Sequence, residues 1–252
     1  MHPIVQFMFT LLWSVPCTQV VEVEHDILGY FYVATTTKIV KLNKNCDTIA
    51  IYNAPKRKKI THIDTSNPLN VLVFFDEIDK LLWLDKSMNE TYSLTAMQLG
   101  LFAIQAAGRS RDDGLWVFDN LQQQIDKINY EERHITKKYD LKTHADAPFQ
   151  FVELKEYNCD LYALDTTKGL YLIDAFGNIK KRLPLLHTYD WQLLNNKLLH
   201  TTTAGWLSYD PLTLTTNAVS SNLPPFTTFS YSHIDNLLIT ADSTHIKLWS
   251  KQ

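Results

Sequence analysis

The 252-residue sequence is poor in glycine and has no excess of basic charge. It contains only seven glycines, whereas roughly 7 % of residues are glycine in an average chain. The glycine-rich loops that bind nucleotide phosphates are absent. The 24 lysines and arginines face 27 aspartates and glutamates, which leaves a net charge of −3. Because nucleic-acid binding needs an excess of basic residues, we expect no nucleic-acid partner.

Cysteine is also scarce, and the familiar catalytic motifs are missing. Cys17, Cys46 and Cys159 are far apart in the sequence, so they predict neither a disulfide framework nor a zinc site. No H-E-x-x-H or G-x-S-x-G motif occurs. We therefore predict no catalytic residue, no metal ligand and no cofactor. What the chain does contain is 45 % apolar residues, which is enough to bury a full core.

The N-terminus holds a short apolar run, Ile4 to Trp13, followed by Pro16 and Cys17. This order is typical of a signal peptide, and the run is too short to cross a bilayer. We predict that residues 1–17 are a signal peptide, that residues 18–252 form a single domain, and that no transmembrane span is present. Two alternatives remain open: Cys17 is lipidated, or the run is a buried strand of a cytoplasmic protein.

A short pattern of apolar positions closed by a polar residue recurs six times at intervals of about 40 residues. Its copies end at Asn43, Asp85, Asn129, Asp174, Asp210 and Ser250. Further segments of four to seven residues flank each copy, and they are rich in β-branched and aromatic residues, which favour strands. The closing Asn and Asp residues are expected to form turns by bonding to the backbone two residues on.

Four strands in each unit of about 40 residues are typical of a propeller blade. The six units therefore predict an all-β, six-bladed β-propeller of four-stranded antiparallel blades. The sixth unit stops at Trp249, after its third strand. We expect Gln19 to Glu24 to supply the missing outer strand, so that an N-terminal strand closes the ring and removes two exposed sheet edges.

Three segments carry a family resemblance: Asp64 to Glu90, Gly114 to Asn129 and Lys168 to Leu185. They resemble an uncharacterised family of exported, propeller-like proteins from Bacteroidota, and the similarity extends over nearly the whole chain after residue 20. The resemblance implies a protein of the periplasm or outer membrane without known enzymatic activity, so no catalytic residues carry over. A weaker similarity to WD40 repeats, at Ile246 to Ser250, lacks their Gly-His dipeptide and indicates only shared strand composition.

A charged loop with glycine at both ends runs from Gly108 to Gly114 and contains three binding candidates, Arg109, Arg111 and Asp113. Loops on a rigid scaffold commonly hold binding sites, although an Asp-Asp-Gly turn is also ordinary hairpin chemistry. The basic run Lys56 to Lys59 is expected to be a solvated connection. Contact with an acidic partner or an anionic membrane surface is its alternative role.

Three further binding candidates lie on strands expected to line the centre of the propeller. His62 and Asp64 alternate on one such strand, where they would face a ligand or form a hydrogen-bonded pair in which Asp64 begins the next turn. Trp191 is the tryptophan that we expect at the surface. The other strand tryptophans should pack between blades; they are Trp83, Trp116, Trp206 and Trp249.

Taken as a whole, the sequence predicts a binding protein rather than an enzyme. We expect a non-catalytic envelope protein whose propeller binds a protein partner or an envelope component through one face, with peripheral association with the envelope. Two alternatives remain: an enzyme of lactonase or glycan-active type centred on the propeller channel, and an intracellular WD40-like adaptor.

Overall fold

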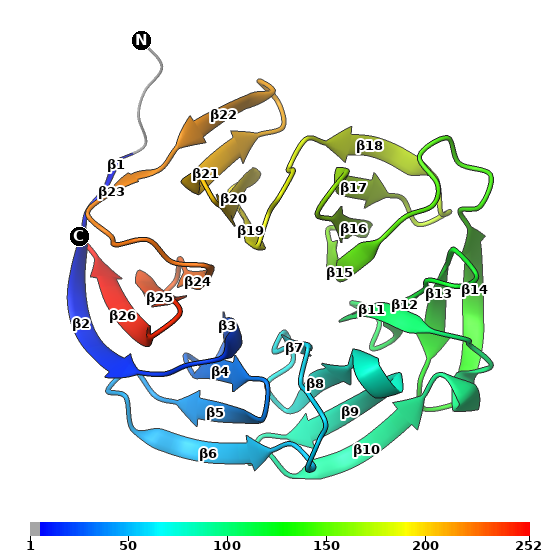
Figure 1. Ribbon diagram of the computed structural model, residues 1–252, viewed down its shortest axis with the longest axis horizontal. Coiled ribbons are helices and arrows are strands. Elements are labelled where there is room, and N and C mark those ends of the chain that lie inside the picture. Colours follow the sequence, from blue (N-terminus) through cyan, green and yellow to red (C-terminus); the bar gives the residue numbers. More distant parts are fainter. Residues whose placement is uncertain (1–5) are drawn as a thin grey trace. The chain divides into compact units, whose positions relative to one another are not determined.

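The computed structural model describes residues 6–252 and contains strands and two three-residue 3₁₀ turns, with no α-helix in that range. The chain folds as a six-bladed β-propeller in which each blade is a four-stranded antiparallel sheet (Figure 1). This confirms the fold predicted from the repeats. Residues 1–5 of the predicted signal peptide lie outside the described residues.

Five blades are built from four consecutive strands, and the sixth combines three C-terminal strands with one from the N-terminus. In chain order the blades are β3 (Val20–His25), β4 (Phe31–Thr35), β5 (Lys38–Leu42) and β6 (Thr48–Asn53); β7 (His62–Asp64), β8 (Asn70–Phe75), β9 (Lys80–Asp85) and β10 (Glu90–Thr95); β11 (Ile104–Arg109), β12 (Leu115–Asp119), β13 (Gln124–Asn129) and β14 (His134–Asp140); β15 (Phe151–Tyr157), β16 (Asp160–Asp165), β17 (Gly169–Ile173) and β18 (Ile179–Leu183); β19 (Asp190–Leu194), β20 (Lys197–Thr202), β21 (Gly205–Asp210) and β22 (Thr215–Ala218); and β24 (Thr228–Ser232), β25 (Leu237–Ala241), β26 (His245–Lys251) and β2 (Phe9–Pro16).

The chain divides into two compact units. The central unit, residues 57–186, holds the second, third and fourth blades. The terminal unit combines the chain up to Lys56 with His187–Gln252 and holds the fifth, sixth and first blades.

An N-terminal strand closes the sixth blade, but it is not the predicted one. β2 pairs antiparallel with β26, from Phe9 opposite Lys251 to Pro16 opposite His245. In Figure 1 the blue strand lies beside the red one. The side-chain amide of Asn222 accepts from the Phe9 N–H (2.9 Å) and donates to the Phe9 carbonyl (2.6 Å). This pair holds the start of β2 in place.

The expectation that Gln19 to Glu24 closes the ring is therefore wrong. That stretch forms β3, the innermost strand of the first blade, and pairs with β4 along its length. Val23 of β3 is almost fully buried. The apolar run predicted as a leader is itself rich in strand-forming residues, and within the described part it continues as β2.

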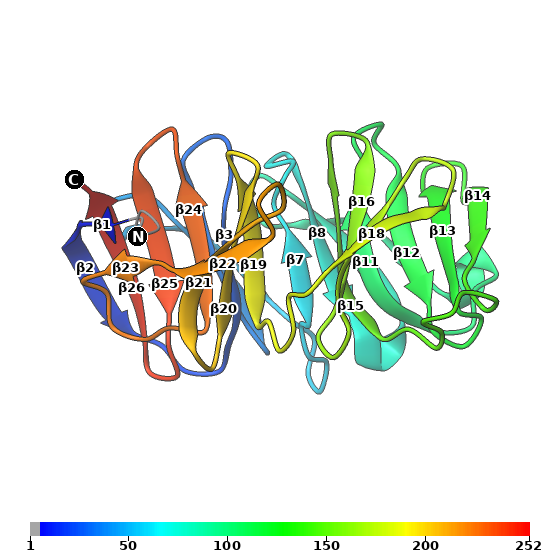
Figure 2. The ribbon, with the colours of Figure 1, turned by 90° about the horizontal axis from the view of Figure 1, so that it is seen from above.

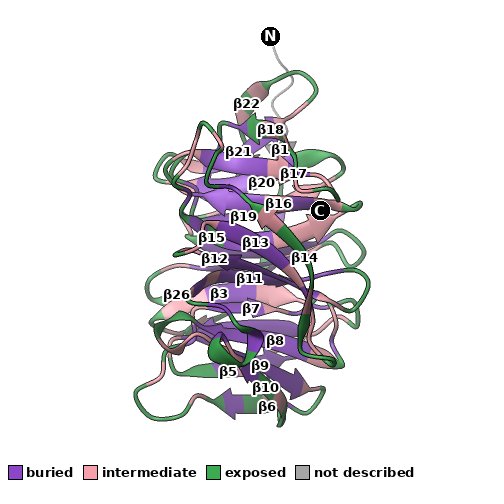
Figure 3. Ribbon diagram, turned by 90° about the vertical axis from the view of Figure 1, so that its right-hand side faces the viewer, coloured by how far each residue is buried: buried purple, intermediate pink, exposed green. Residues whose placement is uncertain are grey.

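Aromatic side chains fill the space between neighbouring blades. In the central unit Trp83 stacks on Tyr130 at 4.7 Å between ring centroids, and Phe118 meets the edge of Phe151 at 4.9 Å. The terminal unit packs Trp206 against Phe229. The prediction that four strand tryptophans pack inside is confirmed: Trp83, Trp116, Trp206 and Trp249 are all buried. Figure 3 shows burial along the strands and exposure in the turns.

The recurrent Asn and Asp residues form turns as predicted. The Oδ1 atom of Asp85 accepts from the N–H groups of Ser87 (2.8 Å) and Asn89 (2.9 Å). The bond to the residue two positions on recurs at three other copies, Asn43, Asp174 and Asp210. At Asn129 the bond goes instead to Glu132, three positions on. The repeat seen in the sequence is thus a repeat of hydrogen-bonded turns.

Candidate functional site

The strands of the central unit run between two edges, each made of turns (Figure 2). Because successive strands are antiparallel, the turns after the first and third strand of a blade share one edge, which we name the hairpin edge. The turns after the second strand and the connections between blades form the opposite, connector edge. Asp64 at the end of β7 accepts a hydrogen bond from the Arg109 N–H at the end of β11. The hairpin edges of the second and third blades therefore lie on the same side.

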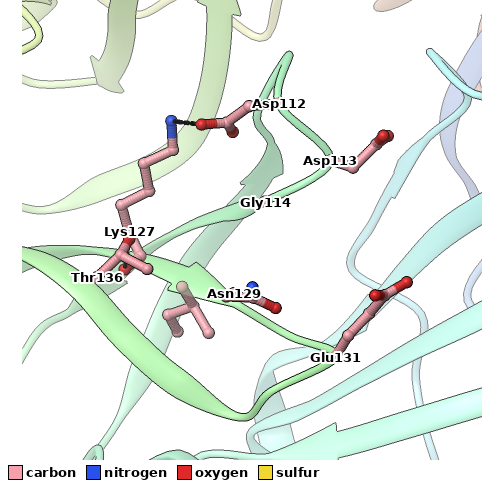
Figure 4. A pocket seen from close by; sticks show the side chains of 8 residues that line it. Asp112, Asp113, Gly114, Lys127, Asn129, Glu131 and Thr136 are labelled. Atoms are coloured by element: carbon pink, nitrogen blue, oxygen red, sulfur yellow. Dashed lines mark hydrogen bonds and ion pairs between the residues drawn. The ribbon is translucent and has the colours of Figure 1, made fainter.

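A pocket of about 250 Å³ lies at the hairpin edge of the third blade. It lies between the β11–β12 turn, closed by a bond from the Ser110 N–H to the Gly114 carbonyl (2.9 Å), and the β13–β14 turn. Figure 4 shows the charged side chains of both turns around it. The lining residues are Asp112, Asp113, Gly114, Lys127, Ile128, Asn129, Glu131 and Thr136.

Lys127 forms one wall of the pocket and is held from two sides. Its ammonium donates to Asp112 Oδ2 at 2.6 Å and lies over the ring of Trp116, 5.1 Å from the centroid. Burial alone would raise the pKa of Asp112, but hydrogen bonds from Lys127 and Ser110 and the charge of Lys127 outweigh it and lower that pKa. This wall of the pocket therefore carries a fixed ion pair at neutral pH.

The opposite wall offers carboxylates and an amide to a ligand. Asp113 and Glu131 are both exposed, and Asp113 Oδ1 lies 3.7 Å from the Arg109 guanidinium. Asn129 donates to Glu132 at 3.1 Å, which orients its amide. The Thr136 hydroxyl donates a hydrogen bond to the Lys127 carbonyl. The pocket can thus form ion pairs and hydrogen bonds with a polar or charged side chain.

The three loop candidates have different positions. Gly108 and Arg109 belong to β11 rather than to a loop, and the Arg109 side chain is buried, with its guanidinium donating to the Asn70 carbonyl at 2.8 Å. Arg109 therefore braces the second and third blades. Arg111 and Asp113 are exposed at the turn, and of the three only Asp113 lines the pocket.

His62 and Asp64 are part of the internal bonding of the central unit. Asp64 Oδ1 accepts from the N–H (3.0 Å) and hydroxyl (2.5 Å) of Ser66, while Oδ2 accepts from the Arg109 N–H (2.9 Å). Asp64 thus begins the turn, as one of the two interpretations expected. His62 is buried, and its ring comes within 4.8 Å of the Glu153 carboxylate. Glu153 in turn pairs with Lys155 (2.5 Å).

Trp191 is not a surface aromatic. Its exposed fraction is 1 %, so the expectation that it lies at the surface is wrong. The reason lies with its neighbour Asp190, whose Oδ2 accepts from the Thr228 hydroxyl (2.6 Å) and the Phe229 N–H (2.9 Å). These bonds draw β19 tightly against β24 and leave the indole inside the terminal unit.

Most of the pocket was missed by reasoning from the sequence. The sequence does not single out Lys127, Glu131 or Thr136, and at Asn129 it predicts only a turn. The available signal was the charged run Glu131-Glu132-Arg133 in the turn that follows the charged loop. Sequence alone does not show that these two turns of one blade face each other.

Comparison with known proteins supports the fold and goes no further. No protein-family model and no curated protein matches the chain. Among solved structures, the WD40 domain of Neurospora crassa Pan2 aligns with a TM-score of 0.68 at 11 % identity, covering 96 % of this chain and 94 % of that one. A streptogramin B lyase aligns with a TM-score of 0.66 at 13 % identity over 98 % of both chains, and a chain of the mitotic checkpoint complex with 0.65 at 10 % identity, over 96 % of this chain and 91 % of that one.

These similarities include a WD40 domain, a lyase and a chain of the mitotic checkpoint complex, so the fold alone does not indicate one function. Among residues 6–252, no helix is long and apolar enough to cross a membrane.

Proposed function

We propose that this protein is a non-catalytic binding scaffold, and that it recognises a protein partner at the hairpin edge of the third blade. The observation that carries the proposal is the pocket between the β11–β12 and β13–β14 turns. Its walls belong to a four-stranded sheet with a buried aromatic core. Exposed polar groups on a rigid support are the usual basis of protein recognition.

The chemistry of the lining favours binding over catalysis. The residues that line the pocket include carboxylates, an amide, an ammonium and one hydroxyl, but no histidine, cysteine or serine. The single hydroxyl, that of Thr136, already donates to a backbone carbonyl. A hydroxyl or thiol nucleophile activated by a neighbouring base is therefore absent from this lining. The same groups suit a partner side chain that carries donors or a positive charge.

Photocrosslinking in the native host tests this proposal. A photoreactive residue placed at Arg111, at the rim of the pocket, should give one discrete crosslinked protein. Reversing two pocket charges, with Asp113→Lys and Glu131→Lys, should abolish that crosslink while the melting temperature stays unchanged. Glu77→Lys, an exposed acid at the connector edge, is the matched control and should leave it intact. A crosslink that persists in the pocket variant would contradict the proposal, as would its loss in the control.

We also propose export to the bacterial envelope, which rests on the apolar N-terminal run and the family resemblance. Cleavage after Cys17 would remove the whole of β2, so the mature protein would then lack the strand that pairs with β26 in the intact chain. N-terminal sequencing of the protein recovered from fractionated native cells is the test. A periplasmic or membrane-associated chain supports export, and a start at Thr18 also supports cleavage. Recovery of the intact chain from the cytoplasm alone would contradict both.

A further inference from the structure

Three large apolar side chains project from the connector edge of the central unit. Met97 in the 3₁₀ turn η2 (Met97–Leu99) is 85 % exposed, Phe102 just after it is 69 % exposed, and Leu121 in the β12–β13 turn is 70 % exposed. Single exposed apolar residues are common on protein surfaces. Three at one edge, on successive turns, form a patch that needs its own explanation.

Hydrogen bonds hold the turns of this patch together. The Asp119 carboxylate accepts from the Phe102 N–H (2.8 Å) through Oδ2 and from the Gln122 N–H (2.9 Å) through Oδ1. The Asn120 N–H donates to the Ala103 carbonyl (3.0 Å). Phe102 and Leu121 therefore lie on turns that are tied to one buried carboxylate. The patch is a fixed feature of the fold.

Basic residues adjoin the apolar patch. Lys59 pairs with Glu77 of the 3₁₀ turn η1 (Asp76–Ile78) at 2.9 Å. The residue after that turn, Asp79, accepts from the Ala96 N–H (3.0 Å) through its carbonyl and from the Ile104 N–H (2.7 Å) through its carboxylate. These bonds connect the basic run, through η1, to the segment that carries Met97 and Phe102.

Two cations of this run remain available for a partner. Arg57 and Lys58 form no ion pair with any residue that the structure describes, and Arg57 is exposed. The neighbouring acids are Glu77, which is neutralised by Lys59, and Asp76, whose carboxylate accepts from the Glu77 N–H. Free positive charge thus lies at the same edge of the blades as the protruding apolar side chains.

We propose that this patch, defined as Arg57, Lys58, Met97, Phe102 and Leu121, docks the protein onto an anionic lipid surface. Apolar side chains that protrude from turns can enter the boundary between headgroups and acyl chains. Adjacent basic residues are attracted to anionic headgroups. This lipid-binding patch lies at the edge of the blades opposite the pocket, so lipid docking does not depend on a partner bound at the pocket.

Vesicle flotation of the full-length protein is the experiment. The protein should float with vesicles of equal parts phosphatidylcholine and phosphatidylglycerol, and it should stay in the dense fraction with phosphatidylcholine alone. The variant Met97→Ser/Phe102→Ser/Leu121→Ser should lower the partition coefficient by on the order of tenfold. Arg57→Glu/Lys58→Glu should lower it comparably, since each basic residue near the surface contributes about fivefold.

A matched control comes from the opposite edge. Leu69→Ser/Phe176→Ser replaces two exposed apolar side chains of the hairpin edge, and it should leave flotation unchanged. Inorganic phosphate at millimolar concentration should not compete, because the apolar contacts need a lipid surface. Failure of the wild type to float would overturn the proposal, and so would equal flotation with both vesicle types or a loss confined to the control. Circular dichroism of each variant distinguishes lost docking from lost folding.

Discussion

At the scale of single residues, short carboxylates and amides hold the turns of this protein. Bonds from the Asn89 backbone and side chain lower the pKa of Asp85, and equivalent bonds from Asn178 lower that of Asp174. Both residues are half-buried at a turn, so their carboxylates keep contact with solvent while they organise the backbone. The repeated Asn and Asp residues need no bound ion to explain them.

Asp64 is a carboxylate whose loss should be measurable. Burial would raise its pKa, but hydrogen bonds from Ser66 and the Arg109 backbone outweigh it and lower that pKa. A lowered pKa means that the stabilisation is present above the ordinary value near 3.8 and is lost as the pH falls below it. In Asp64→Asn an amide N–H would face the Arg109 N–H. We expect a loss of about 1–3 kcal/mol in unfolding free energy at pH 7.

Urea unfolding at pH 7 and pH 3 measures this effect. The difference in unfolding free energy between wild type and Asp64→Asn should be smaller at pH 3, because the native carboxylate begins to protonate there. Asp113→Asn, at an exposed position of the same edge, should change little. Equal stability of Asp64→Asn and wild type at pH 7 would contradict the structural role of Asp64.

His200 should make the terminal unit sensitive to acid. Burial lowers its pKa to about 4. Its Nδ1 lies 3.1 Å from the Thr188 hydroxyl, and its Nε2 has no hydrogen-bond partner among the described residues. The unfolded chain therefore binds a proton at higher pH than the folded chain does. Stability should fall as the pH drops from about 6.5 toward 4, by up to about 3 kcal/mol.

Unfolding free energies measured across that pH range test the prediction. His200→Gln should flatten the dependence, because the proton-binding group is removed, whereas His187→Gln, at an exposed position, should retain it. An unchanged slope in His200→Gln would show that another group is responsible.

At the scale of structural elements, the close approach of inner strands depends on a glycine. A Cβ atom built on Gly108 of β11 would lie 1.9 Å from the Leu154 carbonyl oxygen of β15. Because that oxygen belongs to the backbone, the two strands would have to separate. We expect Gly108→Ala to lower the unfolding free energy by about 1–3 kcal/mol or more.

Thermal unfolding followed by circular dichroism tests this effect. Gly114→Ala is the matched variant, because the nearest atom to its Cβ would be the Ile128 carbonyl oxygen at 3.1 Å. It should lower the melting temperature less than Gly108→Ala does. A melting temperature equal to wild type in Gly108→Ala would mean that the strands are not so close.

At the scale of the whole molecule, closure by the N-terminal strand should dominate stability. Deleting residues 1–17 removes β2 and leaves the β26 edge unpaired. The deletion also removes Phe9, which is buried among aromatic side chains of the terminal unit. Loss of a buried Phe side chain alone lowers the unfolding free energy by about 3–5 kcal/mol. This corresponds to a fall of about 10 °C in melting temperature.

Differential scanning calorimetry of the truncated protein measures this loss. Leu12→Ser, which changes an exposed side chain of the same strand, is the control and should melt within a few degrees of wild type. A truncated protein as stable as the intact chain would show that β2 is dispensable.

The blades could be predicted from the residues alone, because strand composition and turn chemistry are local properties. A few neighbouring residues are enough to indicate a strand at Val71 to Phe75 or a turn at Asp85. The interior positions of four strand tryptophans could also be predicted from strand composition; they are Trp83, Trp116, Trp206 and Trp249.

Three-dimensional packing determines which strand closes the sixth blade, that Trp191 is buried and that Arg109 braces two blades. It also brought the β11–β12 and β13–β14 turns together around the pocket and placed the basic run beside exposed apolar turns. Each of these depends on contacts between residues far apart in the chain. The residues involved, such as Phe9 and Asn222, carry no local sign of their partner.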